Sequence, residues 1–253
     1  MKELWVEKYR PKDVDGYVFR DEHQKRQVQQ WIKDGTIPHL LFSGNAGIGK
    51  TTLAKILLAQ LEVNDLDVLE INASRTNSVE DVRDKVVNFV QMIPFGEFKV
   101  VLLDEADYLS PNAQAALRGV MEEYHTTSRF ILTCNFKNRI IEPLHSRCSS
   151  IEFNISNEDK PILAKNFMAR VEHILTKENI EYNKKAVVEL IVKFFPDWRR
   201  ILNELQRYSS SGKIDVGILT QLSDGSFNTL VQCLKKKEFN QMRNRVAENL
   251  DND

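Results

Sequence analysis

Cysteine is scarce in this sequence: Cys134, Cys148 and Cys233 are the three thiols of a 253-residue chain. Thiols so few and so widely separated exclude a disulfide framework and argue against a cysteine-based zinc site. A reducing compartment is the default setting for such a chain. We therefore expect the protein in the cytoplasm.

Net charge and long apolar runs are also lacking. Lysine plus arginine total 35 and aspartate plus glutamate 36, so the formal net charge is -1. Any contact with nucleic acid must then come from a local basic patch. No apolar run approaches the ~20 residues that span a bilayer, and residues 1–5 do not open a signal peptide. We expect no membrane partner.

What the chain does contain is a phosphate-binding loop at residues 44–51, which fits the pattern G-x-x-x-x-G-K-[ST] at every fixed position. An apolar run at 39–42 predicts a buried strand before it, and the apolar spacing over 52–59 predicts a helix after it. Glycines let such a loop wrap around phosphate oxygens. Lys50 would reach the β- and γ-phosphates, and the Thr51 hydroxyl would hold Mg²⁺. The alternative is an ordinary glycine-rich turn.

Acidic and amide side chains follow two other apolar runs. Residues 99–103 predict a buried parallel strand that ends at Asp104 and Glu105. Ligands bind at the carboxyl ends of such strands, so Asp104 is placed to hold Mg²⁺ and Glu105 to polarise an attacking water. Asn135 follows the run 129–134 and could bind a γ-phosphate or that water. A solvated turn is the alternative for the acids, and a strand-end turn residue for Asn135.

Alternating strands and helices up to about residue 153 predict an α/β domain with a parallel sheet. After that point the strand signal vanishes, and helices are expected to open at Ser156, at Asn183 and after Pro196. The segment 3–20 is expected to be an extended arm because Pro11 disfavours helical geometry at Arg10. Its aromatic residues could flank a flat ring or pack in the core. Further expected strands are 67–71 and 149–153, and further helices are 21–33, 79–90 capped by Ser78, 110–124, 215–222 and one or two in 227–250.

Several of these segments together closely resemble the ATPase subunits of sliding-clamp loaders, namely replication factor C small subunits and their counterparts in T-even-like phages. The matching segments are 5–11, the phosphate loop, 104–107, Asn135, 146–148 and 197–203. The segments 195–199 and 208–210 look nearest to the phage version. Asn45 and Ala46 replace residues that are usually proline-rich in the family, and no fixed position of the loop is lost.

The resemblance implies a domain order and a function. It implies that residues 1–155 form an AAA+ nucleotide-binding α/β domain with helices on both faces of its parallel sheet. A three-helix lid is expected at 156–223. Residues 224–253 are expected to begin a helical collar, which would be truncated here because family members continue beyond this point. It further implies an ATPase that opens a ring clamp and loads it on primer–template DNA during replication. ATP and Mg²⁺ are the implied ligands. The implied partners are the sliding clamp, the DNA and the other loader subunits of a hetero-oligomeric ring, a pentamer in the family. For a phage protein the compartment would be the host cytoplasm.

The family's site residues map onto positions of this sequence. Asp104 matches the metal ligand, Glu105 the water-activating residue and Asn135 the sensor amide. Arg199 matches the lid arginine at the γ-phosphate, and Arg147 matches the arginine finger that acts on a neighbouring subunit's ATP. The arm that contacts the adenine end matches Val6, Glu7, Lys8, Tyr9 and Val18. The phosphate contacts match Gly47, Ile48, Gly49, Lys50, Thr51 and Thr52.

Contacts with DNA and with the clamp are implied in the same way. Matching DNA positions are Arg75, Arg83, Gln114 and Arg118, which would read backbone shape rather than base sequence. Gln114 and Arg118 lie four residues apart on a predicted helix and could act together on a partner. The clamp would meet Met92, Ile93 and Phe95. The alternative for the arginines is that they are simply solvated. The alternative for the turn at 92–95 is that its apolar side chains fill the core, as a core plug.

Two other readings of the whole chain stay open. Residues 104–107 also spell the motif of a DEAD-type helicase, but that fold needs a second RecA-like domain, and the helical segment after residue 155 leaves no room for it. A non-catalytic AAA+ adaptor would bind ATP only as a structural ligand. Glu105 and Arg147 are both present, which argues against the adaptor.

Overall fold

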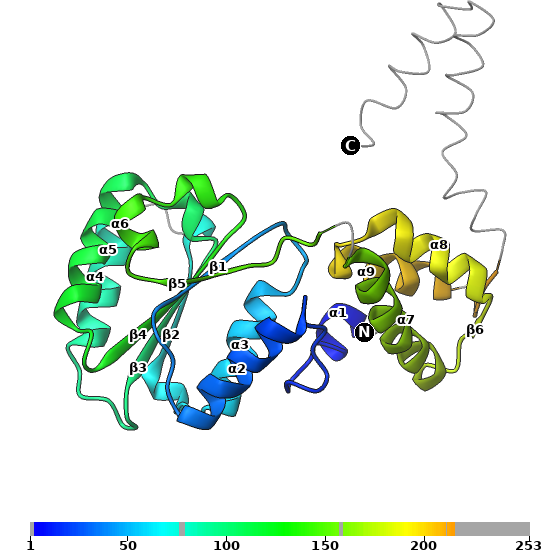
Figure 1. Cartoon of the computed structure of the whole chain (residues 1–253), viewed down its shortest axis with the longest axis horizontal. Coiled ribbons are helices and arrows are strands. Elements are labelled where there is room, and N and C mark those ends of the chain that lie inside the picture. The colour runs from blue at the N-terminus through cyan, green and yellow to red at the C-terminus, as the bar shows by residue number, and fades with distance from the viewer. Residues whose placement is uncertain (1–2, 76–78, 157–158, 211, 216–253) are drawn as a thin grey trace, which may run out of the picture.

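The computed structural model describes residues 3–75, 79–156, 159–210 and 212–215. It consists of an α/β body and a small helical unit, which we call the lid (Figure 1). The body holds the strands β1 (Leu40–Ser43), β2 (Val68–Asn72), β3 (Lys99–Asp104), β4 (Ser128–Cys134) and β5 (Ser149–Glu152), and the helices α2 (Glu22–Asp34), α3 (Lys50–Gln60), α4 (Val79–Val90), α5 (Pro111–Glu123) and α6 (Glu142–His145). The lid holds α7 (Lys160–Lys177), α8 (Lys184–Phe194) and α9 (Trp198–Ser209) with the short strands β6 (Glu181–Tyr182) and β7 (Lys213–Ile214).

The predicted α/β fold is confirmed. The body's five strands form one parallel sheet in the order β2-β3-β4-β1-β5. The helices α2 and α3 cover one face, and α4, α5 and α6 cover the other (Figure 1). Because β1 pairs with both β4 and β5, the loop after β1 opens at the edge where β3 and β4 also end. That edge is where ligands bind in open α/β sheets.

Alternation along the strands explains why both faces are covered. Leu41, Leu103 and Leu132 pack in the cluster under α4 and α5, whereas Phe42 and Leu102 pack in the cluster under α2 and α3. Successive strand side chains point to opposite faces, so a continuous apolar run demands two layers of helices. The strand that leads into the phosphate loop is thereby buried on both faces.

Three expectations require correction. The segment 3–20 is not simply extended, since Trp5–Lys8 form the short helix α1. Pro11 restricts only Arg10, so nothing prevents helical geometry in the preceding turn. The helix expected from Ser156 begins at Lys160. The lid also contains strands, since β6 and β7 pair in parallel.

Some expectations fall on other parts of the chain. Ser78 as an N-cap, most of the helix 215–222 and the collar segment 224–253 lie outside the described residues. Within the described ranges, no helix is both long and apolar enough to cross a membrane.

Candidate functional site

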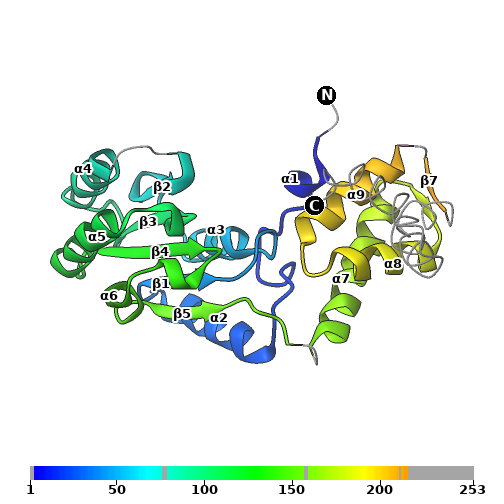
Figure 2. The same ribbon diagram turned by 90° about the horizontal axis from the view of Figure 1, so that it is seen from above.

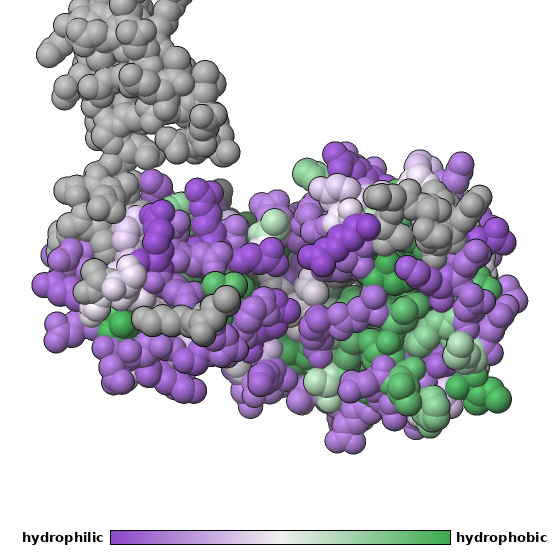
Figure 3. Space-filling model, turned by 180° about the vertical axis from the view of Figure 1, so that it is seen from behind, coloured by the Kyte–Doolittle hydropathy of each residue, from purple (hydrophilic) through white to green (hydrophobic). Residues whose placement is uncertain are grey.

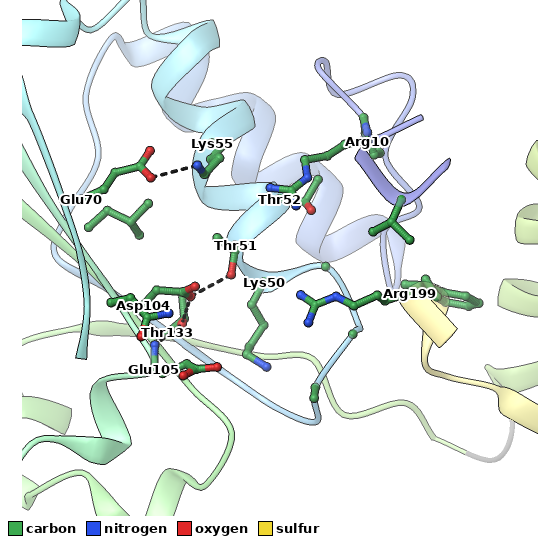
Figure 4. Close-up of a pocket in the computed structure, with 18 of the residues that line it drawn as sticks. Arg10, Lys50, Thr51, Thr52, Lys55, Glu70, Asp104, Glu105, Thr133 and Arg199 are labelled. Carbon is green, nitrogen blue, oxygen red and sulfur yellow. Dashed lines mark hydrogen bonds and ion pairs between the residues drawn. The ribbon is translucent and has the colours of Figure 1, made fainter. Parts of the chain in front are cut away.

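A cavity of about 810 Å³ lies between the carboxyl edge of the sheet and the lid. Its lining comes from the N-terminal arm, the phosphate loop, the ends of β2, β3 and β4, and the lid helices α7 and α9. Figure 4 shows the labelled side chains of the loop, of β3 and of α9 around this space. Segments that are far apart in the sequence therefore meet at one place.

The oxygen atoms at one end of the cavity suit a hard cation. The Thr51 hydroxyl donates to Asp104 Oδ1 at 2.8 Å, and the Thr133 hydroxyl donates to the same oxygen at 2.6 Å. Mg²⁺ prefers a few protein oxygens completed by water and phosphate oxygens. No cluster of three or more His, Cys, Asp or Glu side chains that could hold a metal occurs among the described residues. Thr51 and Asp104 therefore fit Mg²⁺ bound together with a phosphate.

Glu105 is fixed beside this pair by its backbone. Its N–H donates to the Thr133 hydroxyl at 3.0 Å, and its φ of 57° is left-handed, which is uncommon for a non-glycine residue. The carboxylate lines the cavity next to Asp104 (Figure 4). Thr133, which sequence reasoning missed, therefore positions both acids. Its only sequence signal is its place near the end of β4.

Lys50 lies at the centre of the loop, 7% exposed. Its ammonium donates to the carbonyl oxygens of Gly44 and Asn45, both at 2.7 Å, and to Asn135 Oδ1 at 2.9 Å. Burial lowers the pKa of the Lys50 ammonium, and nearby Arg199 lowers it further, whereas Asp104 raises it. An anionic ligand placed beside the Lys50 ammonium would favour its charged form.

Glycine is needed where the loop meets the lid and the arm. Gly47 has a φ of +75°, and a Cβ there would lie 1.9 Å from Asp197 Oδ1 of the lid. Gly49 has a φ of +99°, and a Cβ there would lie 2.9 Å from the hydroxyl of Tyr17. Only glycine tolerates both the dihedral angle and the close approach. The loop is thus packed directly against the lid and the arm.

Basic side chains project into the cavity from two directions. Arg199, at the start of α9, points its guanidinium toward Lys50, while Arg10 reaches from the arm toward Thr52 (Figure 4). Arg10 was missed as a site residue, although it lies inside the matched segment 5–11. Together with Lys50, these arginines bring positive charge where a triphosphate would lie.

The opposite end of the cavity is largely apolar. Val6, Tyr9 and Val18 of the arm line it together with Phe167 and Trp198 of the lid. The two lid rings stack with centroids 4.3 Å apart at 29°. Such a wall suits a flat aromatic ring. Sequence reasoning found the arm residues but not Phe167, because its helical spacing is equally typical of core packing.

Three of the residues matched to nucleotide contacts do not line the cavity. The Ile48 side chain is 5% exposed and packs in the core beneath the loop. Glu7 pairs with Arg10 at 2.7 Å, and Lys8 pairs with Glu178 of the lid at 2.6 Å. Each of these three side chains therefore contacts other residues of the chain and is not part of the cavity lining.

Arg147 lies away from the cavity and is not among the residues that line it. Its guanidinium donates to the carbonyl oxygen of Pro143 at 2.9 Å and pairs with Glu122 of α5. The side chain is 30% exposed. A role in catalysis would therefore have to be exerted on a neighbouring subunit.

The four positions matched to DNA contacts separate into two groups. Arg75, Arg83 and Arg118 are exposed, and Arg118 makes only a loose pair with Glu122 at 3.8 Å. Gln114, in contrast, is 1% exposed. Its amide donates to the carbonyl oxygens of Leu109 and Arg139 and accepts from the N–H of Ile141, so both of its N–H donors and its oxygen bond within the chain. The expectation that it acts with Arg118 on a partner is corrected: Gln114 ties α5 to the segment after β4.

The turn after α4 carries the residues matched to the clamp contact. Met92, Ile93 and Phe95 are 61%, 88% and 73% exposed, which contradicts the core-plug alternative. Figure 3 shows hydrophobic residues gathered on the α/β body, on the right of that view. Exposed apolar side chains concentrated in one turn mark a surface for association.

A buried ion pair holds this turn. Asp67 accepts from the N–H groups of Phe95 at 3.1 Å and Gly96 at 2.8 Å, and from Lys99 Nζ at 3.0 Å. The side chains of Asp67 and Lys99 are 0% and 2% exposed. Burial raises the pKa of Asp67, but the two amides and Lys99 outweigh it and hold that pKa below its usual range.

Replacing Lys99 by methionine should lower the free energy of unfolding by about 3–5 kcal/mol at pH 7, because it leaves a buried carboxylate uncompensated. Asp67 is stabilising above its unfolded pKa, and this contribution is lost as the pH falls through the lower folded pKa. In Lys99→Met the Asp67 carboxylate loses its counter-charge and its pKa rises, so the difference from the parent in the free energy of unfolding becomes smaller as the pH falls and the carboxylate is protonated. Urea unfolding at pH 7 and pH 5 measures both effects. The double variant with Asp67→Asn should recover part of the loss, and a double variant as unstable as the single one would contradict this explanation.

Comparison with known proteins agrees with this geometry. Residues 40–155 match the ATPase family associated with various cellular activities (AAA), and residues 159–220 match the AAA+ ATPase lid domain of the sliding-clamp-loader large subunit. The replication factor C small subunit of Archaeoglobus fulgidus is 36% identical over 95% of this chain and 76% of its own length. The same subunit of Sulfurisphaera tokodaii is 40% identical over 84% of this chain and 64% of its own length. The chain thus spans about two thirds to three quarters of these relatives.

Solved structures show the same fold. The Holliday junction branch migration motor RuvB of Thermotoga maritima superposes with a TM-score of 0.66 at 18% identity, covering 91% of this chain and 80% of RuvB. At that identity the likeness concerns the fold alone. The body and the lid therefore occur together in a solved structure.

Proposed function

The chain belongs to the replication factor C small-subunit family of AAA+ ATPases, and on that premise we propose that it is an ATPase subunit of a sliding-clamp loader. In this role it binds ATP, opens a ring clamp with the other loader subunits and releases the clamp on primer–template DNA when ATP is hydrolysed. One observation carries the proposal: the phosphate loop, the acids after β3 and the lid arginine all line one cavity.

The chemistry follows from the positions of these side chains. Lys50 and the amides at the start of α3 bind the phosphates. Thr51 and Asp104 would hold Mg²⁺, and this ion would neutralise phosphate charge. Glu105 orients the water that attacks the γ-phosphate, and Asn135 shares a hydrogen bond with Lys50 next to that position. Arg199 contacts the γ-phosphate and so links the bound ATP to the lid.

Surfaces outside the cavity are suited to contacts with DNA, with the clamp and with the next subunit. Arg75, Arg83 and Arg118 are exposed cations suited to DNA phosphates, and the turn with Met92, Ile93 and Phe95 is suited to an apolar recess on the clamp. Arg147 acts on the ATP of the next subunit in the ring. The proposal predicts ATP turnover that rises when clamp and primed DNA are both added to the assembled complex. Turnover that ignores both would favour a loader-independent ATPase.

Replacing Lys50 by alanine should weaken ATP binding by about 100-fold or more, because two or more charge-assisted hydrogen bonds of ~1.5–3 kcal/mol each are lost. Titration with a fluorescent ATP analogue measures the loss. Lys55→Ala is the matched control, because Lys55 lies on the same helix and lines the same cavity but pairs with Glu70 at 2.9 Å. Retained affinity in Lys50→Ala would overturn the loop's proposed role.

A further inference from the structure

The beginning of the N-terminal arm, residues 3–9, is attached to the lid, whereas Tyr17 and Phe19 near its other end pack in the core of the body. Trp5 and Tyr9 are buried in the same cluster as the core residues of α7, α8 and α9. The N–H of Trp5 donates to Gln206 Oε1, and the Gln206 amide donates to the carbonyl oxygen of Glu3, both at 2.9 Å. Figure 2 shows α1 lying beside α9. This part of the arm and the lid therefore form one packed unit.

Two lid residues fasten the arm where it reaches the cavity. Glu178, at the end of α7, accepts hydrogen bonds from Lys8 Nζ at 2.6 Å and from the Tyr9 hydroxyl at 2.5 Å. Arg170, half-buried on α7, donates to the carbonyl oxygen of Tyr9 at 2.7 Å and to that of Gly16. A guanidinium can bridge two acceptors because its donors form a rigid fork.

These contacts lie at the apolar end of the cavity and not at its phosphate end. Arg170 and Tyr9 both line the cavity beside Phe167. The hydrogen bonds of Lys50, in contrast, go only to the loop and to Asn135. The two ends of the site therefore rely on different sets of side chains.

We propose that Arg170 and Glu178 are positioning residues for the nucleoside end of ATP. They hold the arm so that Val6, Tyr9 and Val18 face the stacked rings of Phe167 and Trp198, and the base binds between these walls. This inference rests on the proposed function, since it concerns the same triphosphate site. It also implies that the base contacts only residues of the arm and the lid, whereas the phosphates are bound mainly by residues of the body.

Separate ligands for the two ends test the proposal. Arg170→Gln and Glu178→Ala should each weaken MgATP binding about tenfold, since a hydrogen bond to a charged group is lost, and change magnesium tripolyphosphate binding less than about twofold. Isothermal titration of the whole chain measures both affinities. Glu178→Gln, which keeps an acceptor for the Tyr9 hydroxyl, should lie nearer to the parent. Arg207→Gln is the matched control, because that lid arginine pairs with Glu204 at 2.7 Å within α9.

Each result is decisive. Selective loss of MgATP affinity supports the positioning role. Equal loss for MgATP and tripolyphosphate would mean general disruption of the lid and would overturn it, as would unchanged MgATP affinity. A parent chain that binds tripolyphosphate but not MgATP would overturn this inference alone. A parent that binds neither ligand would overturn the proposed function, and this inference with it.

Discussion

Replacing Arg147 by alanine should lower the ATP turnover of the assembled complex by about 10³–10⁵-fold at the site that this arginine completes. The guanidinium would stabilise charge that develops on the transferred phosphoryl group. Arg147 does not line the cavity of its own chain, and its side chain is 30% exposed. The effect must therefore appear at the neighbouring subunit's ATP, while the variant chain still binds its own.

Mixed complexes separate these two effects. Single-turnover hydrolysis is measured with one Arg147→Ala subunit placed beside a parent subunit, and ATP binding is measured on the variant alone. Arg139→Ala is the control, because Arg139 is an exposed arginine near the same surface whose guanidinium lies over Phe136, 4.5 Å from the ring centroid. Undiminished hydrolysis beside Arg147→Ala would leave Arg147 as no more than a tie between Glu122 and Pro143.

Replacing Glu105 by glutamine should lower ATP turnover by about 10²–10⁴-fold and leave ATP affinity nearly unchanged. The amide is isosteric but cannot accept a proton from the attacking water. The left-handed backbone of Glu105 supports this role, since such a conformation at a non-glycine residue costs ~1–3 kcal/mol and clusters at functional sites. Phosphate release by the assembled complex with clamp and primed DNA is the measurement.

Glu70→Gln is the matched control for this variant. Glu70 also lines the cavity, but its carboxylate pairs with Lys55 at 2.9 Å and lies away from the Asp104 site (Figure 4). Turnover of Glu105→Gln at the parent rate would remove Glu105 from the mechanism and would favour the reading in which ATP is only a structural ligand.

Local patterns predicted the part of the site built by consecutive residues. The loop 44–51 and the apolar run before Asp104 each carry a complete physical signal, because glycine dihedrals and strand burial are decided within a few residues. That both meet at one sheet edge follows from parallel topology. Arg199 and Arg147 were placed only by the family resemblance, since a lone arginine has no local pattern of its own.

Local patterns do not settle the exposure of residues whose surroundings come from distant segments. Gln114 has the helical position of an exposed residue, yet it is 1% exposed because the segment after β4 folds over it. The turn at 92–95 has the composition of a core plug, yet it is exposed because Asp67 and Lys99 hold its backbone from beneath. Burial of these positions depends on contacts about 25 or more residues away in sequence.

The sequence by itself determined the α/β body, the phosphate-binding loop and the acids that face it. Each of these depends on neighbouring residues or on a periodicity that is complete within one strand or helix. Only the tertiary structure decided that the beginning of the arm packs on the lid and that Thr133 hydrogen-bonds at both acids. It also decided that Arg170 and Glu178 hydrogen-bond to the arm beside the apolar wall of the cavity. Those arrangements depend on which surfaces pack together across the whole chain. Packing of that kind is a property of complementary shapes, which no short stretch of sequence displays.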